Sequence, residues 1–215
     1  NEKDQTFVRE STLRGHKKPV HALQFCVSSG KSATSKRIVS AGGDGLIFWN
    51  VESGDEVSRV GFENSEFHND AVECGCWTHQ GETFVTGGRD SDLKVWDSTG
   101  TARVKCLETI FGHKAPILDV KFSTKKEILV SCGRDSVIKI WRAHTLAESW
   151  RDRRADDSGI KCALLGTMSG HRGDVTTMAF GPMSRFLYSG ARDNTMMIWD
   201  LEKCIRVREM HDKNA

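Results

Sequence analysis

The stretch "GHKAPILDVKFSTKKEILVSCGRDSVIKIW", residues 112–141, decides the fold of this 215-residue chain. It contains His113, Ser131 and Asp135, which are the residue types of a hydrolytic triad. The same three types can also form a hydrogen-bond network that holds the end of a β-strand in place. The rest of the chain decides between these interpretations, because the pattern is repeated.

The repeat has four copies. Each begins with a His that is followed four residues later by Val or Ile, continues with a Ser or Thr that is followed four residues later by Asp, and ends at a Trp. The four sets are His16, Ser40, Asp44, Trp49; His68, Thr86, Asp90, Trp96; His113, Ser131, Asp135, Trp141; and His171, Ser189, Asp193, Trp199. A hydrolase needs one triad in one cleft, whereas four registered copies indicate a repeat architecture. We therefore interpret each set as structural and expect no catalytic residue.

Alternating apolar residues predict four strands in the third unit: "ILDVKF", "EILVS", "VIKIW" and, after a long loop, "CALLGTM". In a four-stranded antiparallel meander, the turn entering the first strand and the turn between the second and third strands emerge at one end. The His lies in the former turn and the Asp in the latter, so they meet there. The hydroxyl and the indole are their neighbours, so the four groups can satisfy buried donors and acceptors.

These repeats resemble the WD-repeat β-propeller family. The resemblance is carried by the pairs Gly15-His16, Gly112-His113 and Gly170-His171 and by the closing pairs Trp96-Asp97 and Trp199-Asp200. It implies an all-β propeller of four-stranded antiparallel blades in which the four sets are structural tetrads. Some positions depart from the family pattern: Phe67 precedes His68, Asn50 follows Trp49, and Arg142 follows Trp141. Asp44 is also one residue closer to its Trp, so we expect a weakened first tetrad.

We expect a single propeller segment over residues 1–215. It comprises a strand of a preceding blade at 6–12 and blades at 16–62, 68–110, 113–168 and 171–210, with an insertion at 142–160. Propellers of this family close with about seven blades, and an open ring leaves long unpaired edges. We therefore expect about four blades of a larger propeller, whose remainder comes from the same chain or from another chain. A chain that begins with Asn1 fits a trimmed sequence.

Composition narrows the function classes. The net charge is +2, which does not favour nucleic acid as a partner. The seven Cys form no CxxC pair, so we expect core thiols in a reducing compartment and no zinc site. No secretory leader, long apolar run or phosphate-loop, nucleophile-elbow or zinc-protease motif occurs. We expect no membrane segment, metal or cofactor, and a cytoplasmic location with the nucleus as the alternative.

Arg residues stand directly before three of the four tetrad Asp residues, and further basic residues occupy the neighbouring turns. We call the set the basic arc: Arg89, Arg134, Arg192, Lys17, Lys18, Lys114 and Arg172. Arg forms bidentate contacts with carboxylate and phosphate groups. The functional hypothesis is an acidic or phosphorylated protein segment bound across this face. The alternative is that the Arg side chains are solvated or folded onto adjacent turns.

Two insertions fall at the opposite end: "CVSSGKSATSKR" at residues 26–37 and "RAHTLAESWRDRRADDSG" at residues 142–159. In the second, Thr145 and Glu148 fit a capping box, and Leu146 and Trp150 share one helical face. We expect either a short helix or arm that offers Trp150 to a partner, or a polar loop with Trp150 tucked against its own blade.

The sequence favours a non-catalytic scaffold that binds other proteins within a multi-subunit assembly. One alternative is a substrate receptor of a cullin-type ubiquitin ligase, a class that carries Arg or Lys two residues after the closing Trp-Asp. Thr99 and Glu202 occupy those positions here, which argues against it. The other alternative is an RNA-associated propeller that uses the basic arc.

Overall fold

The computed structural model describes residues 12–26, 37–78, 83–97, 104–142 and 162–211. The described chain is built from β-strands and one short 3-10 helix, η2 (Pro182–Ser184). The strands are β1 (Val20–Cys26), β2 (Arg37–Gly42), β3 (Gly45–Asn50), β4 (Glu56–Val60), β5 (Val72–Trp77), β6 (Thr83–Gly88), β7 (Leu93–Asp97), β8 (Lys105–Ile110), β9 (Ile117–Ser123), β10 (Ile128–Gly133), β11 (Val137–Arg142), β12 (Leu164–Ser169), β13 (Val175–Phe180), β14 (Phe186–Ala191), β15 (Thr195–Asp200) and β16 (Ile205–His211).

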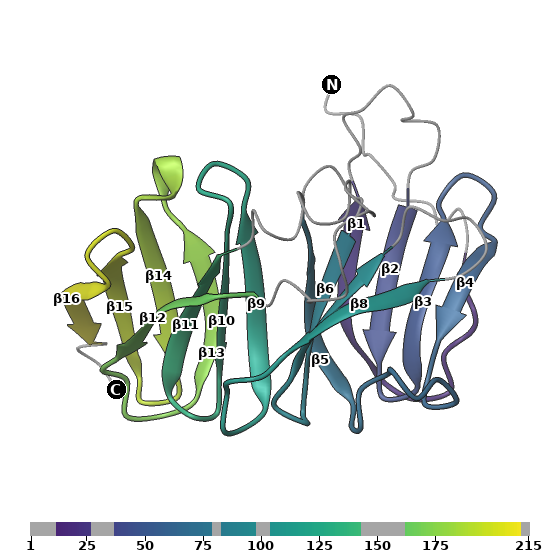
Figure 1. Ribbon diagram of the computed structural model, residues 1–215, viewed down its shortest axis with the longest axis horizontal. Helices are drawn as coiled ribbons and strands as arrows, with labels where there is room; N and C mark the ends of the chain where they lie inside the picture. The colour runs from purple at the N-terminus through teal and green to yellow at the C-terminus, as the bar shows by residue number, and fades with distance from the viewer. Residues whose placement is uncertain (1–11, 27–36, 79–82, 98–103, 143–161, 212–215) are drawn as a thin grey trace, which may run out of the picture.

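The strands form four antiparallel sheets of four strands each, in the orders β1-β2-β3-β4, β5-β6-β7-β8, β9-β10-β11-β12 and β13-β14-β15-β16. This arrangement confirms the predicted all-β fold. We call the sheets blades one to four in chain order. They stand side by side (Figure 1), and the inner strands β1, β5, β9 and β13 contact one another in that order. The turns from each outer strand to the next inner strand run along the lower edge of the view in Figure 1.

The core lies in the seams between blades. Middle strands such as β6 and β10 are buried along their whole length because a neighbouring blade covers each face. At the seam of blades one and two, Phe48, Trp77 and Phe84 pack edge to face, with Trp77 and Phe84 centroids 5.0 Å apart. Outer strands bury less, and β16 is largely exposed. Close packing of this kind holds the described turns between the strands in place.

Several expectations fall outside the described residues: the strand at 6–11, most of the 26–37 insertion, and the 143–161 part of the third-blade insertion, including Trp150. Within the described part of the chain, no helix has the length and apolar character needed to span a membrane.

Candidate functional site at the tetrad end

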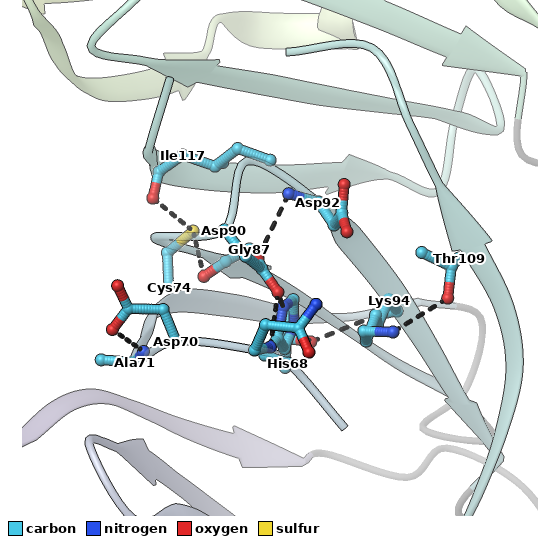
Figure 2. Close-up of polar contacts among 12 residues, drawn as sticks. His68, Asp70, Ala71, Cys74, Gly87, Asp90, Asp92, Lys94, Thr109 and Ile117 are labelled. Atoms are coloured by element: carbon cyan, nitrogen blue, oxygen red, sulfur yellow. Dashed lines mark hydrogen bonds and ion pairs between the residues drawn. The ribbon is translucent and has the colours of Figure 1, made fainter. Parts of the chain in front are cut away.

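Each blade brings its four tetrad residues together at one end, which we call the tetrad end. The Trp Nε1 lies 2.8 Å from the Ser or Thr hydroxyl oxygen in every blade. That oxygen lies 2.7 or 2.8 Å from His Nε2. The His Nδ1 to Asp distances are 2.5, 2.9, 2.8 and 3.1 Å in blades one to four. Figure 2 shows His68 and Asp90 of the second tetrad, with the contact between them drawn as a dashed line.

The network has a single direction of donation. The indole N–H can only donate, and the ionised carboxylate can only accept. The indole therefore donates to the hydroxyl oxygen, the hydroxyl donates to His Nε2, and His Nδ1–H donates to the Asp. This assignment follows from the hydrogen-bond pattern. In this assignment each donor of the network has an acceptor, and the Asp carboxylate accepts at the end of the chain of hydrogen bonds.

The Asp also fixes the turn that leads into the inner strand of its blade, which we call the entry turn. It does so because its carboxylate accepts a hydrogen bond from the backbone N–H of the residue after the His. The donors are Lys17 at 2.5 Å, Asn69 at 2.9 Å, Lys114 at 3.0 Å and Arg172 at 2.7 Å. Burial of each carboxyl opposes ionisation, but hydrogen bonds from the His and the backbone outweigh it. The pKa of all four tetrad Asp residues therefore lies below its ordinary value. Each carboxylate ties the entry turn to the turn between the second and third strands.

This geometry excludes the hydrolytic interpretation of His113, Ser131 and Asp135. Ser131 is fully buried, and its hydroxyl oxygen accepts the Trp141 N–H while it pairs with His113. A nucleophilic Ser must reach a substrate carbonyl beside an oxyanion hole. The hydroxyl is instead enclosed between an indole and an imidazole in every blade, so the four groups fasten neighbouring strands.

The first tetrad forms the same contacts as the others, so the expected weakening is not observed. The departure at Phe67 has a packing explanation. Gly112, like the other Gly-His glycines, lies against its Trp: a Cβ there would come within 2.8 Å of Trp141 Cη2. In blade two the longer entry turn places Phe67 with its ring 5.7 Å from Trp96 and 5.4 Å from Phe62, so an aromatic side chain fills this position.

The members of the basic arc differ in how their side chains are paired. The guanidinium of Arg89 is hydrogen-bonded to Glu73 on β5. Arg134 Nε and Arg192 Nη1 lie 3.9 and 3.5 Å from Asp174 Oδ2, and neither side chain makes a hydrogen bond with a described residue. The four remaining members are exposed: Lys17, Lys18, Lys114 and Arg172. Lys18 Nζ lies 5.7 Å from the centroid of the Phe62 ring. The Arg residues thus have acidic neighbours on adjacent elements.

Sequence reasoning missed four residues of this face. Glu73 and Asp174 are the carboxylates beside the arginines, and Phe62 and Phe111 are exposed aromatics, 47% and 71% accessible, in the entry turns. Their positions in or next to the turns that lead into β5, β9 and β13 could have drawn attention to them, since these turns lie at the same end of the blades as the tetrad Asp turns. Their pairing with particular arginines depends on packing between blades, which the repeat pattern does not specify.

Metal and thiol chemistry has no obvious location in the described chain. No group of three or more His, Cys, Asp or Glu side chains within these residues is arranged to hold a metal ion. All seven Cys residues are free thiols, and five of them are buried. Cys74 and Cys76 lie together in the core between blades two and three, as their shared strand face predicts.

A family model described as "WD domain, G-beta repeat" matches residues 7–49, 64–97, 104–142 and 162–200. The chain belongs to the WD-repeat family. Each match ends at or immediately after a tetrad Trp, so the matched WD repeats and the observed blades share one period.

Two curated relatives are similar over different shares of the chain. Nuclear distribution protein PAC1-2 of Uncinocarpus reesii is 27% identical over 94% of this chain and 45% of its own length. The CCR4-associated factor 4 homolog of Candida glabrata is 31% identical over 56% of this chain and 19% of its own length. The WD-repeat chain thus spans less than half of these relatives.

A solved structure of RRP9 WD40 repeats superposes with a TM-score of 0.73 at 20% identity. The match covers 93% of this chain and 53% of the other chain. At this level of identity the likeness concerns the fold, and it shows that the four blades match part of a WD40 propeller.

Proposed function

We propose that this WD-repeat segment is a non-catalytic scaffold that docks another protein on its tetrad end, within a multi-subunit assembly. The observation that carries the proposal is the set of exposed cations on turns whose backbone is fixed. Arg89, Arg134 and Arg192 each donate their backbone N–H to a carbonyl just before an inner strand, at 2.9 Å in all three blades. Side chains on a preorganised frame lose less freedom on binding, which favours recognition.

The enclosed hydroxyls support the non-catalytic part of the proposal, because Ser131 and its counterparts are unavailable as nucleophiles. The free thiols support a reducing location, so we place the protein in the cytoplasm or the nucleus. An RNA-binding role is less well supported, because the entry turn of blade two carries the acidic residues Glu63, Glu66 and Asp70. For the ubiquitin-ligase alternative, Glu202 remains unfavourable: it pairs with Lys126 at 2.7 Å.

The proposal includes a larger ring of about seven blades. In blade two, Val85, Leu93 and Val95 are fully buried in the core shared with β9 of blade three. The corresponding positions of blade four are Tyr188, Met196 and Ile198, and Met196 is 44% exposed. This open apolar face is the counterpart of one that a following blade covers elsewhere in the chain, which supports a further blade at this position.

Affinity capture from cell extract tests the docking face. The full-length chain is compared with a triple variant, Arg89→Glu, Arg134→Glu and Arg192→Glu. The matched control reverses three charges at the opposite end, Lys125→Glu, Arg185→Glu and Lys203→Glu. We expect the first variant to lose partners that the wild type and the control retain. An unchanged partner set would refute docking at the tetrad end.

A further inference from the structure

The charge on the tetrad end is divided between two halves. Among the described residues, the turns of blades three and four carry, outside the tetrads, the cations Lys114, Arg134, Arg172 and Arg192 and one carboxylate, Asp174. In the turns of blades one and two, Arg14, Lys17, Lys18 and Arg89 are opposed by Glu63, Glu66, Asp70 and Asp92, and by Glu73 at the start of β5. Charges on a surface act over about 8 Å at physiological salt, so the local balance decides what binds. The excess positive potential belongs to blades three and four.

The cations of this half include two guanidinium groups with unused donors. Arg134 comes from blade three and Arg192 from blade four, yet both approach the same oxygen, Asp174 Oδ2. The separations of 3.9 and 3.5 Å are too long for good hydrogen bonds. The two side chains are 46% and 66% exposed, so their N–H groups remain accessible. Arg89 differs, because its guanidinium is already hydrogen-bonded to Glu73.

We propose that the Arg134–Asp174–Arg192 cluster binds a phosphomonoester on a phosphorylated segment of the docked protein. This inference rests on the proposed function and names the chemistry of the partner. The guanidinium forks of Arg134 and Arg192 would each donate to phosphate oxygens, a geometry that Arg suits better than Lys. Within the described residues, the carboxylate of Asp174 contacts the two guanidinium groups at 3.9 and 3.5 Å and can turn away as the phosphate enters.

A phosphate fits the charge distribution better than an extended acidic segment does. A run of Asp and Glu residues crossing the face would meet Glu63, Glu66 and Asp70 on the blade-two turn and be repelled there. A phosphomonoester concentrates a charge of about −2 in one group that can remain over blades three and four. Asp174 reduces the attraction for any anion, but the two arginines outnumber it, and their net attraction grows with the charge of the ligand. A dianion is therefore held more strongly than a single carboxylate.

The direct test uses purified full-length protein and immobilised pools of short degenerate peptides with a central phosphoserine or phosphothreonine. The same pools after phosphatase treatment, and pools with a central Glu, are the reference probes. We expect the phosphorylated pools to retain at least about tenfold more protein than either reference. Equal retention on phosphorylated and dephosphorylated pools would overturn the inference.

Variants locate the site. The double variant Arg134→Gln, Arg192→Gln should lose the phosphate-dependent retention. The matched control Arg14→Gln, Arg185→Gln removes two guanidinium groups that lie outside the cluster and should remain within about twofold of wild type. Asp174→Asn removes the competing carboxylate and should strengthen retention several-fold. If the control loses as much as the double variant, or if Asp174→Asn weakens binding, the assignment is wrong.

Two further arms separate the possible sources of failure. Inorganic phosphate should displace the peptides only at concentrations far above those of the peptides themselves. Displacement at peptide-like concentrations would indicate a site for the free ion and contradict docking of a phosphorylated segment. Extract treated with phosphatase before affinity capture should lose the partners that depend on the arginines. If those partners remain, the docking function stands and only the phosphate inference fails.

Discussion

Thr195 Oγ1 lies 2.6 Å from Asp193 Oδ1, so the carboxylate of the fourth tetrad receives a hydroxyl hydrogen bond in addition to its backbone donors. Asp135 is the equivalent residue of the third tetrad, and its Oδ1 is buried without a hydrogen-bond partner in the described chain. Val137 occupies the position that corresponds to Thr195. A methyl group thus stands where blade four has a hydroxyl donor.

Val137→Thr should therefore stabilise the protein. The new hydroxyl can donate to Asp135 Oδ1, and a hydrogen bond to a buried carboxylate contributes about 1 kcal/mol or slightly more. Denaturant titration would show a higher midpoint with an unchanged slope. The reciprocal variant, Thr195→Val, should lower the unfolding free energy by a similar amount. A lower midpoint for Val137→Thr would contradict this account of the third tetrad.

Removal of a tetrad carboxylate should destabilise the fold. Asp135→Ala or Asp193→Ala leaves a buried imidazole N–H and an entry-turn amide without an acceptor, at a cost of about 1–3 kcal/mol each. Asp55→Ala, which changes an exposed turn carboxylate, is the control and should have little effect. Thermal melts compare the three variants. An unchanged melting temperature for either tetrad variant would show that the network does not fasten the strands.

Stability should fall in acid because the tetrad carboxyls have lowered pKa values in the folded state. Their contribution is fully present above the ordinary unfolded pKa of about 3.9 and is lost as the pH falls through the folded value. Asp119 acts in the opposite direction: its burial raises its pKa, despite the hydrogen bond from the Met178 N–H and the nearby Lys121. Its contribution is present at low pH and is lost as the pH rises through its folded value.

Unfolding free energies measured between neutral pH and pH 3 would separate these terms. Asp193→Asn should reduce the loss of unfolding free energy between neutral pH and pH 3. Asp119→Asn should increase that loss, because the carboxyl group of Asp119 opposes it in the wild type. The same slope in both variants and the wild type would show that neither carboxyl contributes to the pH dependence.

The thiols should divide into slow and fast groups when the folded protein meets a thiol-reactive dye. Cys74, Cys76 and Cys132 are buried in blade seams, and burial raises the pKa of all three thiols. They should react only after denaturation, because the thiolate is the reactive form and access is blocked. Cys106 and Cys204 are half-buried and should be modified first. Mass spectrometry after brief labelling identifies the modified positions, and early modification of Cys132 would contradict the seam packing.

The repeated unit made most of the fold predictable. Ser131 and Trp141 have fixed spacing to His113, and alternation of apolar residues predicts the strands on which they lie, so their convergence follows from local pattern and sheet topology. In the third blade, β9, β10, β11 and β12 begin and end within two residues of the four strands expected there.

The pairing of surface charges could not be predicted in the same way. Arg134 and Arg192 look equivalent to Arg89 in the sequence, yet only Arg89 forms a hydrogen-bonded ion pair. The difference depends on Glu73 and Asp174, single residues outside the repeat pattern whose positions follow from how adjacent blades pack. The aromatic replacement at Phe67 was visible in the sequence, but its accommodation depends on a turn that is longer than those entering blades three and four.

All four members of each tetrad come from one blade and the turn that enters it. A gene segment copied from one His to the next would therefore carry a complete set of tetrad donors and acceptors, and the tetrad of the additional blade would need no compensating change in the other blades. Tandem duplication can therefore lengthen the ring while every new tetrad keeps all its hydrogen-bond partners. The residue before each tetrad Asp takes no part in this network and can vary, as Gly43 and the three arginines illustrate.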